Sequence, residues 1–216
     1  MGPVATSPRG AVTVGIDIGQ KRDPTAIAVV ETQRRVTPQS GREETYHLVR
    51  HLERVPLDTA YPQVAARLVA LVAALVAQGR TPVVFLDATG VGQGVLDLVR
   101  AAGVQATPVY FTAGARRRPG ATGQVSLGKG WLVARLQALM QTGRLLLPQT
   151  AEAAALAGEL GSYEIRVDSD AHTRYGAFAG GAHDDLVTAL GLAVQGSDVR
   201  KNAGRAETDE PHTDRH

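Results

Sequence analysis

Three segments of the sequence could do chemistry, because in each an aspartate stands where an apolar strand or helix ends. They are Val12-Thr-Val-Gly-Ile-Asp17, Val83-Val-Phe-Leu-Asp87 and Ala182-His183-Asp184-Asp185. A carboxylate at a strand end is held by a rigid scaffold and still faces an edge that ligands reach. Mg²⁺ and Mn²⁺ prefer oxygen ligands, and two such ions about 4 Å apart can activate water and stabilise the leaving oxygen in phosphodiester cleavage. We therefore expect the three segments to converge on divalent metal ions.

Each acid also has a purely structural interpretation. Asp17 lies between Ile16 and Ile18, where an unpaired buried carboxylate would cost on the order of several kcal/mol, so we favour a ligand over a residue that only caps the following turn. Asp23 precedes Pro24, and an aspartate turn is a sufficient explanation for it. We treat Asp23 as a turn residue first and as an outer-shell ligand second.

The double acid Asp184-Asp185 opens an apolar helical pattern. Acids in a first helical turn bind free N–H groups and oppose the helix dipole, so one of the two can be only a cap. Two adjacent acids beside His183 exceed what capping needs. His183 is accordingly a candidate outer-shell group.

Glycine-rich stretches give weaker signals for phosphate binding. Gly90-Val-Gly-Gln-Gly94 lacks the GxGxxG spacing of dinucleotide-binding loops, and Gly123 to Lys129 matches GxxxxGK but is followed by Gly130. The Ser or Thr that holds Mg²⁺ in nucleotide-binding loops is therefore missing. We do not expect an ATPase of this type, whereas Lys129 at the start of a helix is a reasonable phosphate contact.

Composition and hydrophobic patterning exclude several kinds of protein and of site. The 216 residues are 44% hydrophobic, which suits one substantial core, and the lack of cysteine excludes disulfides, thiolate zinc sites and a cysteine nucleophile. The longest apolar run, residues 64–77, is interrupted by Arg67 and is shorter than the roughly 20 residues of a membrane span. The first ten residues lack a signal-peptide core.

Basic residues are concentrated in one place, although the net charge is only +2. Arg116, Arg117, Arg118 and Lys129 lie in an acid-free stretch over 113–130. Such a stretch near acidic residues suits an enzyme that holds phosphates beside metal ions. The alternative is a solvated loop.

The order of apolar segments predicts one α/β domain over 11–196, with a disordered leader over 1–10 and a disordered polar tail over 197–216. Three strands come first and helices then alternate with strands, which predicts a mixed sheet of five or slightly more strands covered by helices. Strands are expected over 12–18, 25–31, 45–52, 82–87, 104–110 and 145–147, an edge hairpin over 163–167 and 173–178, and helices over 61–78, 92–102, 124–142, 151–160 and 183–195.

The acidic motifs resemble those of a known family. Gly15-Ile-Asp17-Ile-Gly-Gln-Lys-Arg-Asp23, Leu86-Asp87-Ala-Thr-Gly-Val-Gly92 and Gly181-Ala-His183-Asp184-Asp185-Leu-Val-Thr-Ala-Leu are similar to motifs of the nuclease domain of the large terminase subunit of tailed bacteriophages. The resemblance covers residues 12–195. It implies a ribonuclease H-like fold, in which a mixed sheet with its first three strands antiparallel and the later ones parallel carries helices on both faces.

This resemblance also implies an activity. Asp17, Asp87 and Asp184 would be catalytic ligands of two Mg²⁺ or Mn²⁺ ions, with Asp185 an additional or alternative ligand. The protein would be an endonuclease that cuts concatemeric double-stranded DNA during packaging, in the cytoplasm of a bacterial host, with a separate packaging ATPase and a portal as partners. The lack of an ATPase motif leaves open an isolated domain, a split subunit or a standalone relative.

Three other interpretations remain open. A junction resolvase of the same superfamily would prefer four-way junctions over linear duplex. Gly15-Ile-Asp17-Ile-Gly-Gln also resembles the first phosphate motif of actin-like ATPases, although these need two such domains. A non-catalytic docking module would lack metal-dependent cleavage.

Overall fold

The computed structural model describes residues 10–19, 23–36, 41–112, 116–121, 123–162, 164–167, 173–176 and 184–195. The predicted leader up to residue 9, the tail beyond residue 196 and His183 lie outside these ranges. The helices are α1 (Tyr61–Ala77), α2 (Gly92–Ala101), α3 (Lys129–Gln141), α4 (Ala151–Ser162) and α5 (Asp185–Ala193).

Eight strands of the described chain form one mixed sheet in the order β6-β7-β5-β4-β1-β2-β3-β8. The first three strands pair antiparallel, and β4, β5 and β7 join parallel to one another on the other side of β1. This confirms the predicted sheet class, with more strands than expected. The strands are β1 (Ala11–Asp17), β2 (Ala26–Val36), β3 (Glu43–Arg54), β4 (Val83–Asp87), β5 (Ala106–Thr112), β6 (Arg117–Pro119), β7 (Val125–Gly128) and β8 (Leu145–Leu146), with β9 (Glu164–Val167) and β10 (Thr173–Gly176) as a separate hairpin.

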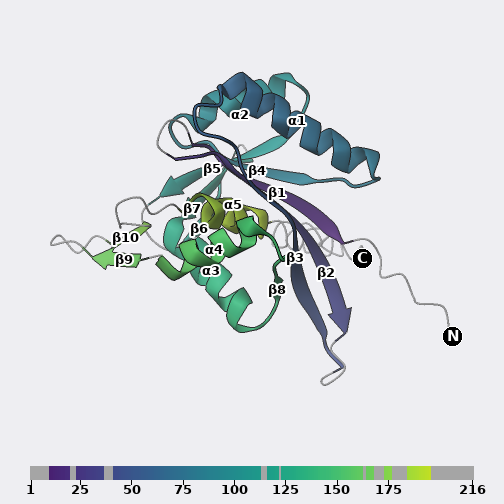
Figure 1. Ribbon diagram of the computed structural model, residues 1–216, viewed down its shortest axis with the longest axis vertical. Helices are drawn as coiled ribbons and strands as arrows, with labels where there is room; N and C mark the ends of the chain where they lie inside the picture. The colour runs from purple at the N-terminus through teal and green to yellow at the C-terminus, as the bar shows by residue number, and fades with distance from the viewer. Residues whose placement is uncertain are drawn as a thin grey trace, which may run out of the picture.

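Helices cover both faces of the sheet, with α1 and α2 on one face and α3, α4 and α5 on the other (Figure 1). Successive side chains of a strand point to opposite faces, so β4 contributes Val84 and Leu86 to the α1–α2 side and Phe85 to the other. Burial on both faces requires apolar residues at successive positions, and β4 has them from Val83 to Leu86. Among the described helices, none is both long and apolar enough to cross a membrane.

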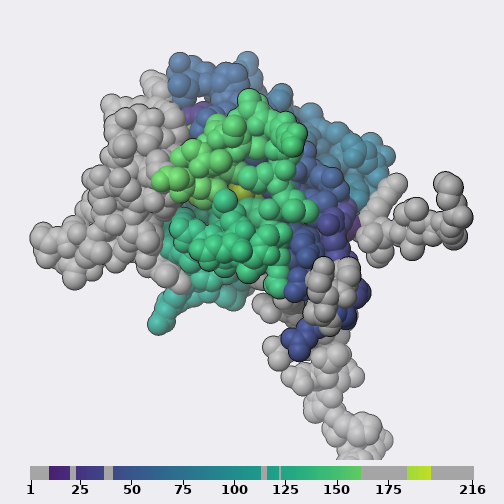
Figure 2. All heavy atoms as spheres, turned by 60° about the horizontal axis from the view of Figure 1, so that its bottom comes forward, coloured from purple at the N-terminus to yellow at the C-terminus, as the bar shows by residue number. Residues whose placement is uncertain are grey.

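Helix α5 lies in the middle of its layer. Its nine residues are all buried, and Figure 2 shows only a small part of it between α3 and α4. Gly15 of β1 permits this close packing, because a Cβ there would lie 2.1 Å from the carbonyl oxygen of Ala189 and 2.4 Å from the nitrogen of Ala193. The strand that ends at Asp17 is thus in direct contact with the helix that begins at Asp185.

The single helix predicted over 124–142 is wrong at its start. Residues 125–128 form β7, which pairs with β5 in the register Val109↔Val125, and α3 begins only at Lys129. Val125 and Leu127 are buried and alternate with the less buried Ser126. This two-residue alternation is typical of a strand, but the segment is too short to be distinguished from the helical pattern that follows it. Most of the segment that matches a nucleotide-binding loop is therefore a strand, and its Lys129 begins α3.

The β2–β3 hairpin is longer than the strands predicted over 25–31 and 45–52, because residues 32–36 and 43–44 also pair. Their side chains interact across the two strands. Arg34 is 3.6 Å from Glu43, and the guanidinium of Arg35 lies over the ring of Tyr46. Opposite charges and cation–π contacts across neighbouring strands stabilise polar strands of this kind.

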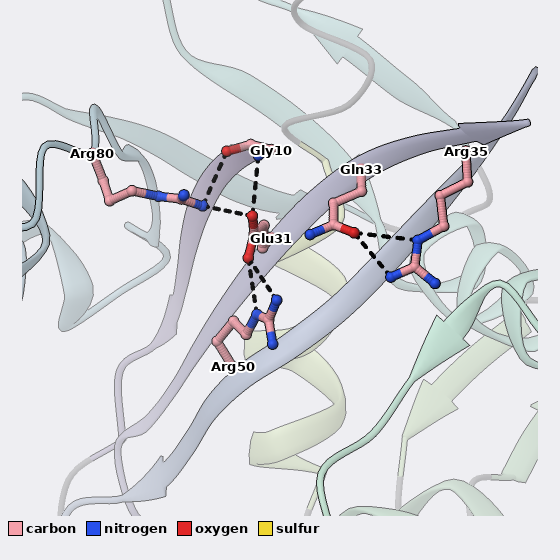
Figure 3. A network of polar contacts seen from close by, with 6 residues as sticks. All are labelled: Gly10, Glu31, Gln33, Arg35, Arg50 and Arg80. Atoms are coloured by element: carbon pink, nitrogen blue, oxygen red, sulfur yellow. Dashed lines mark hydrogen bonds and ion pairs between the residues drawn. The ribbon is translucent and has the colours of Figure 1, made fainter. Parts of the chain in front are cut away.

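A buried carboxylate, Glu31, fastens the start of β1 to the sheet (Figure 3). Its Oε1 accepts a hydrogen bond from the Gly10 backbone N–H at 3.0 Å and lies 2.9 Å from Arg80 Nη2, and its Oε2 accepts one from Arg50 Nε at 2.9 Å. Burial alone would raise the pKa of Glu31, but the hydrogen bonds from Arg80, Gln33 and Arg50 dominate and lower it to about 2.

We expect Glu31→Gln to lower the free energy of unfolding at pH 7 by about 3 kcal/mol, the equivalent of the pKa shift from 4.5 to about 2. Because the folded-state pKa is depressed, the contribution is complete above pH 4.5 and is lost as the pH falls towards 2. Urea unfolding of both proteins from pH 7 to pH 3 should therefore give converging curves. Glu43→Gln, which removes an exposed carboxylate from the same hairpin, is the control and should have little effect. A constant difference across this range would contradict the assignment.

Candidate active site

Asp17 and Asp87 end adjacent parallel strands. The register Ile16↔Leu86 between β1 and β4 brings the two carboxyl groups into hydrogen-bonding reach at one edge of the sheet. Burial and then repulsion by Asp87 raise the pKa of Asp17 well above its usual range, and burial also raises the pKa of Asp87. The two strand-end acids are therefore neighbours, as the sequence predicted.

The turn after β4 holds Asp87 in place. Its Oδ1 accepts a hydrogen bond from the Thr89 backbone N–H at 2.8 Å, and the Thr89 hydroxyl accepts one from Phe111 N–H at 3.0 Å. Gly90 takes a left-handed conformation with φ of 59°, which favours glycine. Gly92 starts α2 so close to the strand that a Cβ there would lie 1.8 Å from the Asp87 carbonyl oxygen. The glycines serve the turn and the close approach of α2.

The other two acids come from the start of α5. Asp184 is its N-cap residue and Asp185, which is 2% exposed, is its first residue. Asp184 Oδ2 is 3.2 Å from Lys129 Nζ at the start of α3. The negative charges of both acids add to the rise in the pKa of Asp17. The start of α5 therefore lies close enough to the strand-end pair to repel its charge.

Lys129 is the counter-charge of this cluster. Burial would lower the pKa of its ammonium group, but Asp184, Asp17 and Asp87 together raise it, and the group also lies 5.7 Å from the centre of the Phe111 ring. Lys129 was expected as a phosphate contact near the acids. The structure places it among them.

The chemistry of these side chains fits hard divalent cations. Four carboxylates supply only oxygen donors, the kind that Mg²⁺ and Mn²⁺ prefer, and their mutual repulsion at Asp17 is what a bound cation would relieve. Within the described ranges, no three His, Asp or Glu side chains already stand at metal-binding spacing. The fit therefore rests on the donor set and its electrostatics.

The predicted basic stretch pairs at the sheet edge with the segment that leads into Lys129. The Arg116 carbonyl accepts a hydrogen bond from Gly128 N–H at 2.8 Å, and Gly128 directly precedes Lys129. Arg116 and Arg118 are exposed, whereas Arg117 donates from Nε to Gln195 Oε1 at 3.1 Å. The stretch is therefore partly the edge strand β6 rather than a free loop, and one of its arginines binds Gln195, just after the end of α5.

Asp23 and His183 were the two candidates for outer-shell groups. Asp23 is exposed in the segment before β2, as suits a turn residue next to Pro24. His183 lies outside the described residues, so its outer-shell role stays a prediction.

Sequence reasoning missed Glu159 and Arg54. Glu159 of α4 is 6% exposed and forms an ion pair with Arg54 at the end of β3, and Arg54 Nε is 3.7 Å from Asp185 Oδ2. The signal was available, because Glu159 stands three residues after Leu156 and six after Ala153, on the apolar face of an alanine-rich helix. An acid at such a position calls for a buried partner.

Solved structures of similar fold include terminase nucleases. That of the large terminase nuclease from thermophilic phage G20c has a TM-score of 0.60 at 22% identity, covering 87% of this chain and 83% of that one, and it has also been solved with cobalt or magnesium bound. The manganese-soaked human cytomegalovirus terminase nuclease domain gives 0.54 at 12% identity, covering 89% and 86%. The large terminase nuclease domain of bacteriophage SPP1 with bound manganese gives 0.52 at 10% identity, covering 88% of each chain.

No protein-family profile and no curated protein matches the sequence. The structural likeness nevertheless extends over most of both chains, and it agrees with the sheet order, in which an antiparallel β1–β2–β3 unit is extended by parallel strands. The chain therefore has the ribonuclease H-like fold of large terminase nuclease domains.

Proposed function

We propose that this protein is a divalent-metal-dependent endonuclease that cuts double-stranded DNA. The observation that carries the proposal is the gathering of Asp17, Asp87, Asp184 and Asp185 from β1, β4 and α5 at one edge of the sheet. The likeness to terminase nucleases solved with magnesium, manganese or cobalt supports the same chemistry here.

The four aspartates would hold two Mg²⁺ or Mn²⁺ ions, with Asp185 an additional or alternative ligand. Bound there, such ions supply an activated water and stabilisation of the leaving 3′ oxygen. The protein's own part is to fix the carboxylates on rigid elements and to hold Asp184 through Lys129. The exposed Arg116 and Arg118 would bind DNA phosphates beside the site, without reading base sequence.

Cleavage of concatemeric viral DNA during packaging is the setting that we propose for this activity. It would require a packaging ATPase and a portal as partners. The ATPase would be separate from the described residues, because the middle of the GxxxxGK segment forms β7 and its lysine begins α3. The direct test of the chemistry does not need these partners. It uses supercoiled plasmid and the protein alone.

Plasmid nicking should occur with Mg²⁺ or Mn²⁺ and stop when EDTA is added. Equal nicking in EDTA would contradict metal dependence. Nicking that is strongly enriched at four-way junctions would instead favour a resolvase. Calorimetric titration with Mn²⁺ measures metal binding separately, so a protein that binds metal and does not cut is distinguished from one that does neither.

Neutralising the exposed arginines should weaken DNA binding. The double variant Arg116→Ala, Arg118→Ala should flatten the slope of log K against log salt by about 2, since roughly 0.9 counterions are released for each phosphate neutralised. The double variant Arg34→Ala, Arg35→Ala is the charge-matched control, because these residues lie at the far end of β2 from its pairing with Asp17. An unchanged slope in the first variant, or an equal change in both, would exclude a specific DNA contact by Arg116 and Arg118.

A further inference from the structure

The N-terminus of α5 is not capped by its own N-cap residue. The first N–H groups of a helix have no acceptor within it, and an N-cap aspartate usually accepts the N–H of the second or third residue. Asp184 makes no such hydrogen bond. Its side chain instead faces Lys129, with Oδ2 3.2 Å from Nζ.

Glu159 supplies the acceptor from another helix. Its Oε2 accepts a hydrogen bond from the backbone N–H of Val187 at 3.0 Å, and Val187 is the third residue of α5. This is the bond that an N-cap side chain would normally make. Glu159 is 6% exposed, so the bond is shielded from water.

Arg54 lies near both Glu159 and Asp185. A buried carboxylate is costly unless it is paired and hydrogen-bonded, and the Arg54 guanidinium pairs with Glu159 through its other oxygen. The Nε of Arg54 is 3.7 Å from Asp185 Oδ2. One cation from the end of β3 thus lies between the capping acid of α4 and the first acid of α5.

We propose that Glu159 is a positioning residue, which caps α5 from α4 and thereby leaves the Asp184 carboxylate available to the acidic cluster. Arg54 balances the charge of the buried capping acid and approaches the first residue of α5. If Asp184 capped its own helix, its carboxylate would turn towards the Val187 N–H and away from Lys129. The proposal rests on the proposed function only in taking Asp184 and Asp185 as metal ligands.

Capping and simple charge balance predict opposite results for two variants. Glu159→Gln keeps an oxygen within reach of the Val187 N–H and loses the charge, and Arg54, whose side chain is 31% exposed, has room to turn aside. Glu159→Asp keeps the charge but is one methylene too short for the cap. If Glu159 acts by capping, the glutamine variant resembles the wild type and the aspartate variant does not.

The test combines three measurements on the full chain. Mn²⁺ affinity by calorimetry and plasmid nicking should both fall about tenfold in Glu159→Asp and Glu159→Ala, the usual effect of losing a residue that orients metal ligands, and stay near wild type in Glu159→Gln. Hydrogen exchange of the Val187 amide, followed by NMR without metal, should accelerate in the same two variants. Glu152→Ala, on the first turn of the same helix, is the control and should leave all three unchanged.

A wild-type-like Glu159→Asp beside an impaired Glu159→Gln would overturn capping in favour of charge balance. Wild-type values in all three Glu159 variants would also overturn it. If Glu159→Ala fails to fold, the glutamine and aspartate variants still decide. If the wild type neither binds Mn²⁺ nor cuts DNA, the proposed function fails, and Val187 amide exchange still reports whether Glu159 caps α5.

Discussion

The Asp17→Asn variant is expected to lose about a thousandfold in the rate of metal-dependent plasmid nicking, because a metal ligand contributes several kcal/mol of transition-state stabilisation. Asparagine keeps the volume of the side chain and removes its charge. DNA affinity measured in EDTA should therefore stay close to wild type. The rate with Mg²⁺ and with Mn²⁺ is the primary measurement.

Stability gives this variant a second signature. The pKa of Asp17 is raised by burial and by repulsion from Asp87, so its ionised form destabilises the folded state at any pH above that raised value. The neutral asparagine removes this repulsion, and we expect Asp17→Asn to melt at a higher temperature than wild type in EDTA. Mg²⁺ should then raise the melting temperature of the wild type and leave that of the variant unchanged.

The other acids provide a graded comparison. Asp184→Asn should lose cleavage like Asp17→Asn, Asp185→Asn somewhat less, and Asp23→Asn least, since Asp23 is exposed beside Pro24. An Asp17→Asn protein that cuts as fast as wild type would end the two-metal proposal. Loss of folding rather than of cleavage in Asp17→Asn would make the residue structural.

Gly15→Ala is expected to lower the free energy of unfolding by about 3 kcal/mol, at the upper end of what overpacking a core costs. The new methyl group would lie 2.1 Å from the Ala189 carbonyl oxygen and 2.4 Å from the Ala193 nitrogen, so α5 must move off β1. Because α5 carries Asp184 and Asp185, nicking should fall together with stability. Urea unfolding and plasmid nicking measure the two effects.

Gly94→Ala on α2 is the matched control. A Cβ at Gly94 meets nothing within 4 Å, so alanine should stabilise this helix by about 0.5–1 kcal/mol and leave nicking intact. If Gly15→Ala is as stable and as active as wild type, the contact between β1 and α5 is not what holds the last two acids in place.

The strands that carry the first two acids were predictable, because buried parallel strands are continuous apolar runs and Asp87 stands at the end of one. The predicted ends of the helices at residues 78, 102 and 142 are each one residue beyond the observed ends of α1, α2 and α3. The start of α3 was not predictable in the same way. A four-residue strand and the following helix share valines, leucines and glycines, and only the pairing of Val125 with Val109 separates them.

The acids of the site could be proposed from sequence because an aspartate at the end of an apolar segment is conspicuous. Their partners could not, since which cation or amide meets which carboxylate depends on contacts between distant elements. Lys129 was expected beside the acids and lies among them. Glu159 and Arg54 lie far apart in sequence, and no local pattern indicates that Glu159 meets α5.

The packing of the last described helix against the first described strand has a consequence for when the four acids come together. During synthesis the strands that end at Asp17 and Asp87 emerge early. Helix α5, which begins at Asp185 after its N-cap Asp184, emerges after all the described strands. A nascent or partly folded chain therefore holds only half of the carboxylates. Contacts between distant segments close late in folding. Under the proposed function, DNA cleavage would therefore begin only when the two ends of the domain have met.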